Sequence, residues 1–339
     1  MRVETYIPGL TSDSKNIAKH AEDIGYDALV SGELNNEPFL PVLIGLEHTN
    51  LIVRTGLAIA FPRSPMTVAN MGWDLQAFSS GRFQLGLGTQ VKGHNERRFS
   101  VPWSPPAPRM REYILAVKAI WNTWKTGEKL DFQGEHYTHT LMTPMFTPPP
   151  MEVDCPPIYV SGLGPGMARI AGEVADGLLL DPMCSKDYIK EIILPAVAEG
   201  AKRGNREVSD CELLWGGFIA TGETEEELAK AKRDIAARIS FYASTRTYRQ
   251  ALDFHGWGDV NEKLHALSIQ GEWQKMFDLV SNEMVETLGF CGNGKEVANS
   301  LKDELGPFCS AVMWNEIEHL GTDHSQDERM SELLQIVKS

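Results

Sequence analysis

The chain has 339 residues, and its 32 Lys and Arg residues against 46 Asp and Glu residues give a net charge of −14. This acidic balance argues against nucleic acid and anionic membrane surfaces as partners, because both need a basic face. No apolar run approaches the roughly 20 residues of a membrane span, and the N-terminus MRVETYIPG has no apolar export segment. The five cysteines are scattered without a CxxC pair, and the histidines form no metal-ligand pattern. We therefore expect a cytoplasmic protein without a metal site.

The first 124 residues alternate strand and helix signals. A predicted amphipathic helix ends at Gly25, and Pro65 begins another helix. The predicted strands are 3–7, 27–31, 51–60 and 82–87. The predicted buried positions are Val68, Met71, Leu75 and Phe78 in the helix after Pro65, and Met110, Ile114, Val117, Trp121 and Trp124 in the helix 109–124. Short apolar strands alternating with helices are typical of a parallel sheet.

The same rhythm returns in the second half of the chain, between two irregular stretches. A short hairpin at 131–137 precedes a proline-rich stretch, and 246–287 is polar, helical and irregular. The later predicted strands are 158–161, 177–181, 213–220 and 308–314. Eight strands, most of them followed by a helix, predict an α/β fold of the (β/α)8 TIM barrel type. We expect one barrel domain over 1–339, with insertions at about 127–157 and 246–287.

Four segments of the chain combine in a distinctive order and spacing. They are AEDIGYDALVSGE (21–33), TGLAIAFPRSPMTVA (55–69), DLQAFSSGRFQLGLGTQ (74–90) and PPIYVSGLGPGMARIAGEVADGLLL (156–180). Together they resemble the luciferase-like monooxygenase superfamily, most closely its branch that uses coenzyme F420, an 8-hydroxy-5-deazaflavin. The resemblance implies a bacterial luciferase-like barrel and an oxidoreductase that transfers a hydride between F420 and a small organic substrate. It also implies a homodimer in which early helices meet; the stripe of Met71, Leu75 and Phe78 and the Trp121/Trp124 face fit that interface or a core equally well.

The site is expected at the C-terminal ends of the strands, where TIM barrels place their chemistry. The expected cofactor-binding residues are Leu57, Ala58, Thr89, Gln90, Lys92, Ser161, Gly162, Leu163, Gly164, Pro165, Gly166, Met167 and Asp181. The glycines of the loop 162–167 let a ligand approach the backbone, and amides at the start of the following helix can bind a phosphate. The resemblance further implies a non-proline cis peptide in the third strand, placed by position between Leu57 and Ala58.

Glu33 and His94 are the candidate catalytic residues. Glu33 ends the second strand, where related deazaflavin enzymes carry an acidic residue followed by a histidine; here Leu34 follows, so the mechanism of the sugar-phosphate dehydrogenases does not transfer. Glu33 can bond the cofactor ring, act as acid and base, or be a surface glutamate. His94 is a possible proton donor in a loop whose basic residues would attract an anionic cofactor. These basic residues are Lys92, Arg97 and Arg98.

Three other interpretations remain open. An FMN-dependent monooxygenase would use reduced flavin to activate oxygen, which a deazaflavin handles poorly. A barrel that binds no flavin would serve as a partner subunit. A dinucleotide-binding fold would use the glycines of 162–166, but the third glycine of its fingerprint would fall on Met167 and the unit follows four earlier strand–helix units. Binding of F420 and FMN separates the first two from the deazaflavin hypothesis.

Overall fold

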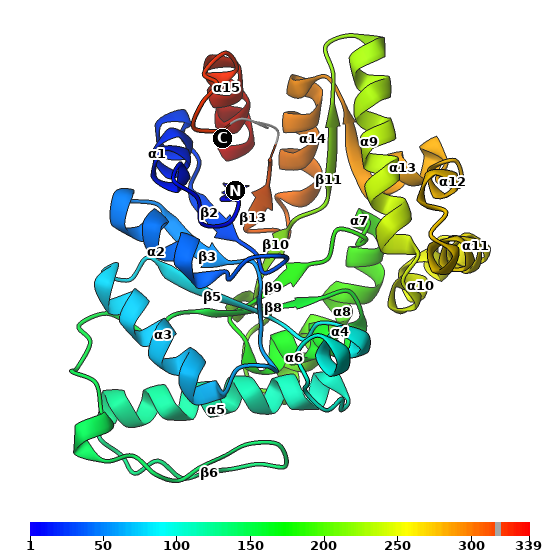
Figure 1. The fold of residues 1–339 in the computed structure, drawn as a ribbon. Helices are drawn as coiled ribbons and strands as arrows, with labels where there is room; N and C mark the ends of the chain where they lie inside the picture. The colour runs from blue at the N-terminus through cyan, green and yellow to red at the C-terminus, as the bar shows by residue number, and fades with distance from the viewer. Residues whose placement is uncertain (316–319) are drawn as a thin grey trace.

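Eight parallel strands close into a barrel in the computed structural model, which describes residues 1–315 and 320–339 (Figure 1). The barrel strands are β1 (Arg2–Tyr6), β2 (Ala28–Ser31), β3 (Ile52–Thr55), β5 (Phe83–Gly88), β8 (Ile158–Gly162), β9 (Gly177–Leu180), β10 (Glu212–Trp215) and β13 (Ala311–Met313). Each strand pairs in parallel with its neighbour around the ring, and the pairing of β3 with β5 closes it. The predicted TIM barrel is confirmed.

Helices surround the barrel and bury one apolar face each. The helices that follow barrel strands include α1 (Ser14–Ile24), α2 (Phe39–His48), α3 (Pro65–Phe78), α5 (Pro106–Thr126), α6 (Pro165–Val174), α8 (Leu194–Arg203), α14 (Gly294–Leu305) and α15 (Asp327–Lys338). In α1, Ile17, Ala21 and Ile24 are buried and Gly25 ends the helix at φ 104°, as the sequence predicts. The C-terminal helix α15, which packs on α1 and β1, has no counterpart among the predicted elements.

The tryptophan face of α5 belongs to the core of the chain itself. Trp121 and Trp124 are almost fully buried, and the Trp121 indole N–H donates to the carbonyl of Ala69 at 3.0 Å. Trp124 packs edge to face on Trp73 of α3. These side chains therefore do not form a subunit interface. The predicted buried face of α3 is wrong at Phe78, which is 55% exposed because it ends the helix on the solvent side.

The barrel interior contains a layer of charged and polar side chains. Glu4 of β1 forms an ion pair with Arg54 of β3, and both are buried. Glu212 of β10 accepts from Arg2 at 2.7 Å and from the hydroxyl of Tyr159 at 2.9 Å. Burial, followed by the nearby Glu212 carboxylate, raises the pKa of Tyr159. Because buried charges need partners, this layer pairs its charges internally.

Two predicted strands are each divided in the structure. Residues 51–60 form β3 and the short β4 (Ala58–Ile59), which both run along β5. Residues 213–220 were expected to form one strand; the structure ends β10 at Trp215 and begins β11 at Phe218 after two glycines. β11 (Phe218–Thr221) leaves the barrel and pairs in parallel with β12 (Gly289–Gly292).

The two irregular stretches fold as separate additions. The first contains the expected hairpin, β6 (Phe132–Gln133) and β7 (Thr138–His139), whose turn donates three backbone N–H groups to the carboxylate of Glu112. Between β11 and β12 the chain forms a helical excursion on one side of the barrel (Figure 1). Its helices are α9 (Glu225–Ala243), α10 (Arg249–Phe254), α11 (Gly258–Gln270), α12 (Trp273–Phe277) and α13 (Asn282–Leu288). The excursion has its own apolar cluster. Among the described helices, none combines the length and apolar character that crossing a membrane requires.

Candidate active site

The C-terminal ends of the eight strands meet at one end of the barrel, which we call the mouth. Parallel strands carry the residues that follow them to the same edge. Tyr6, Ser161 and Asp181 share the inward-pointing register of Glu4, Tyr159 and Leu179. The mouth therefore gathers most of the residues predicted for the site. Burial raises the pKa of Tyr6, whose hydroxyl lies against Gly32.

The loop from β8 to α6 leaves backbone N–H groups without a side-chain cap. Gly164 is the N-cap residue of α6 and supplies no side-chain hydrogen bond. Pro165 has no N–H, so Gly166 and Met167 carry the first amides of the helix. A side-chain carbon on Gly166 would find its nearest neighbour, Ala107, 4.0 Å away. The first amides of α6 thus have no side-chain cap, as an anion at the position predicted for a phosphate would require, and the Gln250 side chain lies against the neighbouring Gly164.

The break between β3 and β4 supplies a bulge at the mouth. The cis peptide bond lies between Gly56 and Leu57, so the predicted position between Leu57 and Ala58 is wrong by one residue. The reason is that Ala58 already belongs to β4, pairs with Leu87 and is fully buried. Leu57 remains partly accessible, whereas the Ala58 side chain is fully buried.

Glu33 supports this bulge. Its carboxylate accepts from the backbone N–H of Ile59 at 2.7 Å and pairs with the guanidinium of Arg63 at 2.7 Å. Its own N–H donates to the carbonyl of Leu57. The Glu33 side chain is 8% exposed, so the interpretation of a free surface glutamate is wrong. The carboxylate that was expected to act on a ligand is already held by two donors.

The loop after β5 divides into an ordered turn and an exposed basic rim. Gln90 adopts φ 54°, and its side-chain oxygen accepts from the N–H of Val91 at 2.8 Å. Buried Asn95 donates to the carbonyl of Thr89 and so fixes the turn. Lys92 and His94 lie exposed on the short helix α4 (Lys92–Arg97). Thr89 and Gln90 are thereby placed at the mouth, and His94 lies on the rim.

Asp181 is the carboxyl group at the mouth with the most perturbed ionisation. Burial raises its pKa to about 6, although hydrogen bonds from the Met183 N–H and the Tyr248 hydroxyl act in the opposite direction. Tyr248 comes from the excursion. The same burial raises the pKa of Tyr248, helped by the charge of Asp181. A partly accessible carboxyl group whose pKa is raised toward neutral pH is typical of acid–base sites.

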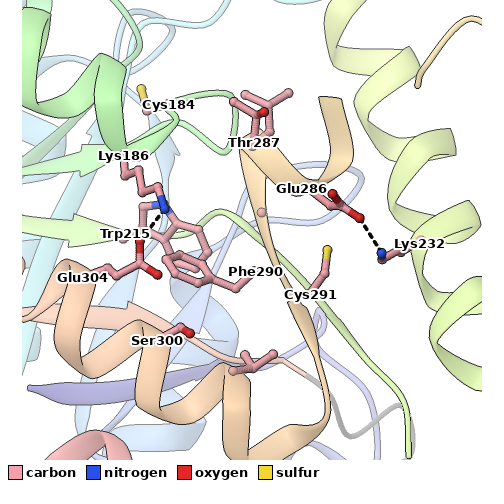
Figure 2. A pocket seen from close by; sticks show the side chains of 13 residues that line it. Cys184, Lys186, Trp215, Lys232, Glu286, Thr287, Phe290, Cys291, Ser300 and Glu304 are labelled. Carbon is pink, nitrogen blue, oxygen red and sulfur yellow. Dashed lines mark hydrogen bonds and ion pairs between the residues drawn. The ribbon is translucent and has the colours of Figure 1, made fainter. Parts of the chain in front are cut away.

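A pocket lies beside the mouth, between α7 (Lys186–Tyr188), β12 and α14 (Figure 2), and its volume is about 290 Å³. The rings of Trp215 and Phe290 pack edge to face in it. Two ion pairs border it, Lys186 with Glu304 and Lys232 with Glu286. None of the predicted site residues lines this pocket, so it is separate from the expected cofactor position.

His20, His324 and Asp327 are a group whose ligand atoms lie within 4.8 Å of one another. His20 Nδ1 accepts from the N–H of Gly321 at 2.7 Å, which leaves the ring proton on Nε2. His20 Nε2 then donates to Asp327 at 2.8 Å, so it offers no lone pair to a metal. The group is a hydrogen-bonded contact between α1 and α15.

Comparison with known proteins decides the family. The model of the luciferase-like monooxygenase family matches residues 9–306. The chain belongs to the luciferase-like monooxygenase family. The match begins just after β1 and runs from α1 to α14, including the loop before α6. Dinucleotide binding by a Rossmann fold is thereby excluded as the architecture of this chain.

Relatives of this luciferase-like chain include proteins with and without an assigned activity. It is 43% identical over 304 residues to an uncharacterized protein of Mycobacterium tuberculosis, covering 89% of each chain. It is 24% identical over 290 residues to the 5,10-methylenetetrahydromethanopterin reductase of Archaeoglobus fulgidus, covering 84% of this chain and 83% of the reductase. Its fold matches the coenzyme F420-dependent tetrahydromethanopterin reductase of Methanopyrus kandleri, with a TM-score of 0.76, 19% identity and 99% and 98% coverage. EDTA monooxygenase of Chelativorans has the same fold, with a TM-score of 0.70, 14% identity and 100% and 93% coverage.

Sequence reasoning missed two residues that shape the mouth. Arg63, six residues after Leu57, fixes Glu33, and Tyr248 reaches Asp181 from a segment 67 residues further along the chain. Arg63 lies in the segment 55–69 that carries the family resemblance but was given no role there, and Tyr248 lies in none of the four segments. The carboxylate Glu33 beside an apolar strand is a signal that a cationic partner must exist, but the sequence alone does not say which residue supplies it.

Proposed function

We propose that this chain binds coenzyme F420 at the mouth and transfers a hydride between it and a small organic substrate. The observation that carries the proposal is the uncapped start of α6 at Gly166, in a luciferase-like barrel whose bulge faces the same mouth. Relatives support the cofactor: the F420-dependent glucose-6-phosphate dehydrogenase of Beutenbergia cavernae is 31% identical over 153 residues, 44% of this chain. When bound, the deazaflavin supplies or accepts the hydride.

The residues present fit such a cofactor. The N–H groups of Gly166 and Met167 would hold its phosphodiester, and the backbone of Gly56 and Leu57 would support its ring system. Lys92 is 63% exposed and would attract an anionic tail at the rim. The contribution of the protein is then positioning and electrostatics, while Glu33 keeps the bulge in place through Ile59.

The second candidate is an FMN-dependent monooxygenase, favoured by the similarity in fold to EDTA monooxygenase. Titration of the purified chain with F420 and with FMN, followed by cofactor fluorescence, separates the two. We expect saturable binding of F420 and no binding of FMN. Binding of FMN alone would replace our proposal with the monooxygenase, and binding of neither would favour the non-catalytic barrel.

We also infer a homodimer that forms through α2. Leu40 and Leu43 on this helix are 49% and 39% exposed, although most large apolar side chains of the barrel are buried. Exposed apolar side chains gathered on one helix are typical of an interaction surface. The tryptophans of α5 do not contribute, because the chain itself buries them.

A further inference from the structure

Asp181 is a carboxyl group at the mouth whose role the proposed cofactor contacts leave open. It follows β9 and continues the register of Leu179, which packs inside the barrel against Tyr159 and Leu214. Alternate residues of a strand point to the same face, so the Asp181 side chain points into the barrel at its open end. It remains partly accessible.

Only neutral groups hold this carboxyl. The N–H of Met183 donates to Oδ1 at 2.9 Å, and the hydroxyl of Tyr248 donates to Oδ2 at 3.1 Å. The titratable groups that face it are Tyr248, Tyr242 of α9 and Cys184. Within residues 1–315 and 320–339, no lysine, arginine or histidine forms an ion pair with Asp181. Within these described residues, no cation therefore pairs with the ionised carboxylate.

The other acidic and basic candidates are less suited to exchange a proton. The Glu33 carboxylate is held by Arg63 and by the N–H of Ile59. His94 lies exposed on α4, outside the barrel interior. Asp181 combines an inward direction, partial access and a pKa near 6, so it changes between its protonated and ionised forms near pH 6.

We propose that Asp181 is the acid and base that exchanges a proton with an uncharged carbonyl substrate or its alcohol, and that Tyr248 positions it. This inference rests on the proposed function. On reduction, the carbonyl carbon gains the hydride and the carbonyl oxygen gains the proton of Asp181, so the C=O double bond becomes a single bond with new C–H and O–H bonds. The carboxylate left behind accepts hydrogen bonds from Tyr248 and Met183. Oxidation of the alcohol runs the same transfers in reverse.

The charge of the site defines the substrate class. A carboxylate without a cationic partner repels phosphorylated and carboxylated molecules at the point where the reacting oxygen would lie. An uncharged carbonyl oxygen instead accepts a hydrogen bond from the protonated carboxyl. The substrate is therefore a ketone or aldehyde that carries no anionic group near its carbonyl.

The test compares wild type with Asp181→Asn and Tyr248→Phe, using reduced F420 and the probes acetone, cyclohexanone and dihydroxyacetone phosphate. We expect wild type to reduce an uncharged ketone at a rate that falls above about pH 6. Asp181→Asn should lose about 100-fold in rate while F420 fluorescence titration gives unchanged affinity. Tyr248→Phe should move the falling limb up by about one pH unit, because the carboxylate loses a stabilising donor. Tyr242→Phe removes a neighbouring phenol that does not bond Asp181 and should leave the limb in place.

A second measurement needs no turnover. Infrared titration of the cofactor-free protein should show a protonated carboxyl band that disappears with a midpoint near pH 6 and is missing in Asp181→Asn. If wild type fails to bind F420, the proposed function fails. If F420 binds, the inference about Asp181 is overturned by any of four results: full activity of Asp181→Asn, an infrared midpoint in the ordinary aspartate range, no reduction of either ketone, or preferred reduction of dihydroxyacetone phosphate.

Discussion

At the residue scale, ionisation of Asp181 is linked to folding. Its folded pKa near 6 lies above the ordinary value of 3.8, so between these pH values the folded state holds a proton that the unfolded state releases. The free energy of unfolding therefore falls as pH rises from about 4 to 6. Asp181→Asn removes this loss, and above pH 6 we expect it to be more stable than wild type by on the order of 1–2 kcal/mol. Urea unfolding of both proteins at about pH 4.0 and pH 7.5, at the lower edge of this window and above it, measures the difference in the free energy of unfolding. An equal difference at both pH values would contradict the linkage.

Glu33 and Arg63 make a second prediction at this scale. Their side chains are 8% and 18% exposed, so water screens the pair only in part. We expect a double-mutant cycle of Glu33→Gln and Arg63→Gln to give a coupling energy of about 1–3 kcal/mol in unfolding. The exposed pair of Lys92 and Glu96, whose charged atoms are 3.9 Å apart, is the control and should give under about 0.5 kcal/mol. Equal coupling in the two cycles would show that Glu33 does not brace the bulge.

The sequence predicts only in part which residues form the site at the mouth. Strand ends and glycines are local signals, and they led to Glu33, Gly166 and Asp181, whose roles remain predictions. Which side chains pair across the mouth is a tertiary property, so neither Arg63 nor Tyr248 could be found from its own surroundings in the sequence.

At the element scale, substitutions at the start of α6 should change the affinity for F420 without changing the stability of the fold. A side-chain carbon on Gly166 would make an ordinary van der Waals contact, 4.0 Å from the Cβ of Ala107. Gly166→Ala and Gly166→Val should therefore fold with melting temperatures close to wild type. The larger valine should abolish F420 binding because it fills the space before the helix amides, and alanine should weaken it less. Calorimetry and fluorescence titration check both properties; normal affinity in Gly166→Val would remove the phosphate site from α6.

The same scale shows why two strand predictions needed correction. The apolar patterns over 51–60 and 213–220 continue across glycines at which one strand ends before the next begins. These glycines are Gly56 in the first segment and Gly216 and Gly217 in the second. Periodicity reports which residues are buried, and residues on both sides of these breaks are buried. The break positions depend on pairing with β5 and β12, which are distant in sequence.

At the scale of the whole molecule, the barrel was predictable because eight strand–helix repeats have few ways to close. The interface of the proposed homodimer was not predictable, since a buried apolar stripe and an apolar stripe at an interface look alike in sequence. If the proposed dimer forms through α2, Leu43→Glu should convert it to a monomer in sedimentation equilibrium, because a charge would be buried at the interface. Met145→Glu, at another exposed apolar position (89% exposed), is the control and should leave the dimer intact. A dimer that survives Leu43→Glu but not Met145→Glu would place the interface elsewhere.

The central claim is that F420 binds at the mouth of this barrel, with its phosphate held by the N–H groups at the start of α6. A crystal structure of the chain with F420 bound tests it most directly. We expect the cofactor phosphate within hydrogen-bond distance of the N–H groups of Gly166 and Met167, and the deazaflavin ring against Gly56 and Leu57. A cofactor bound outside the mouth, for example in the pocket beside Trp215 and Phe290, would contradict the account.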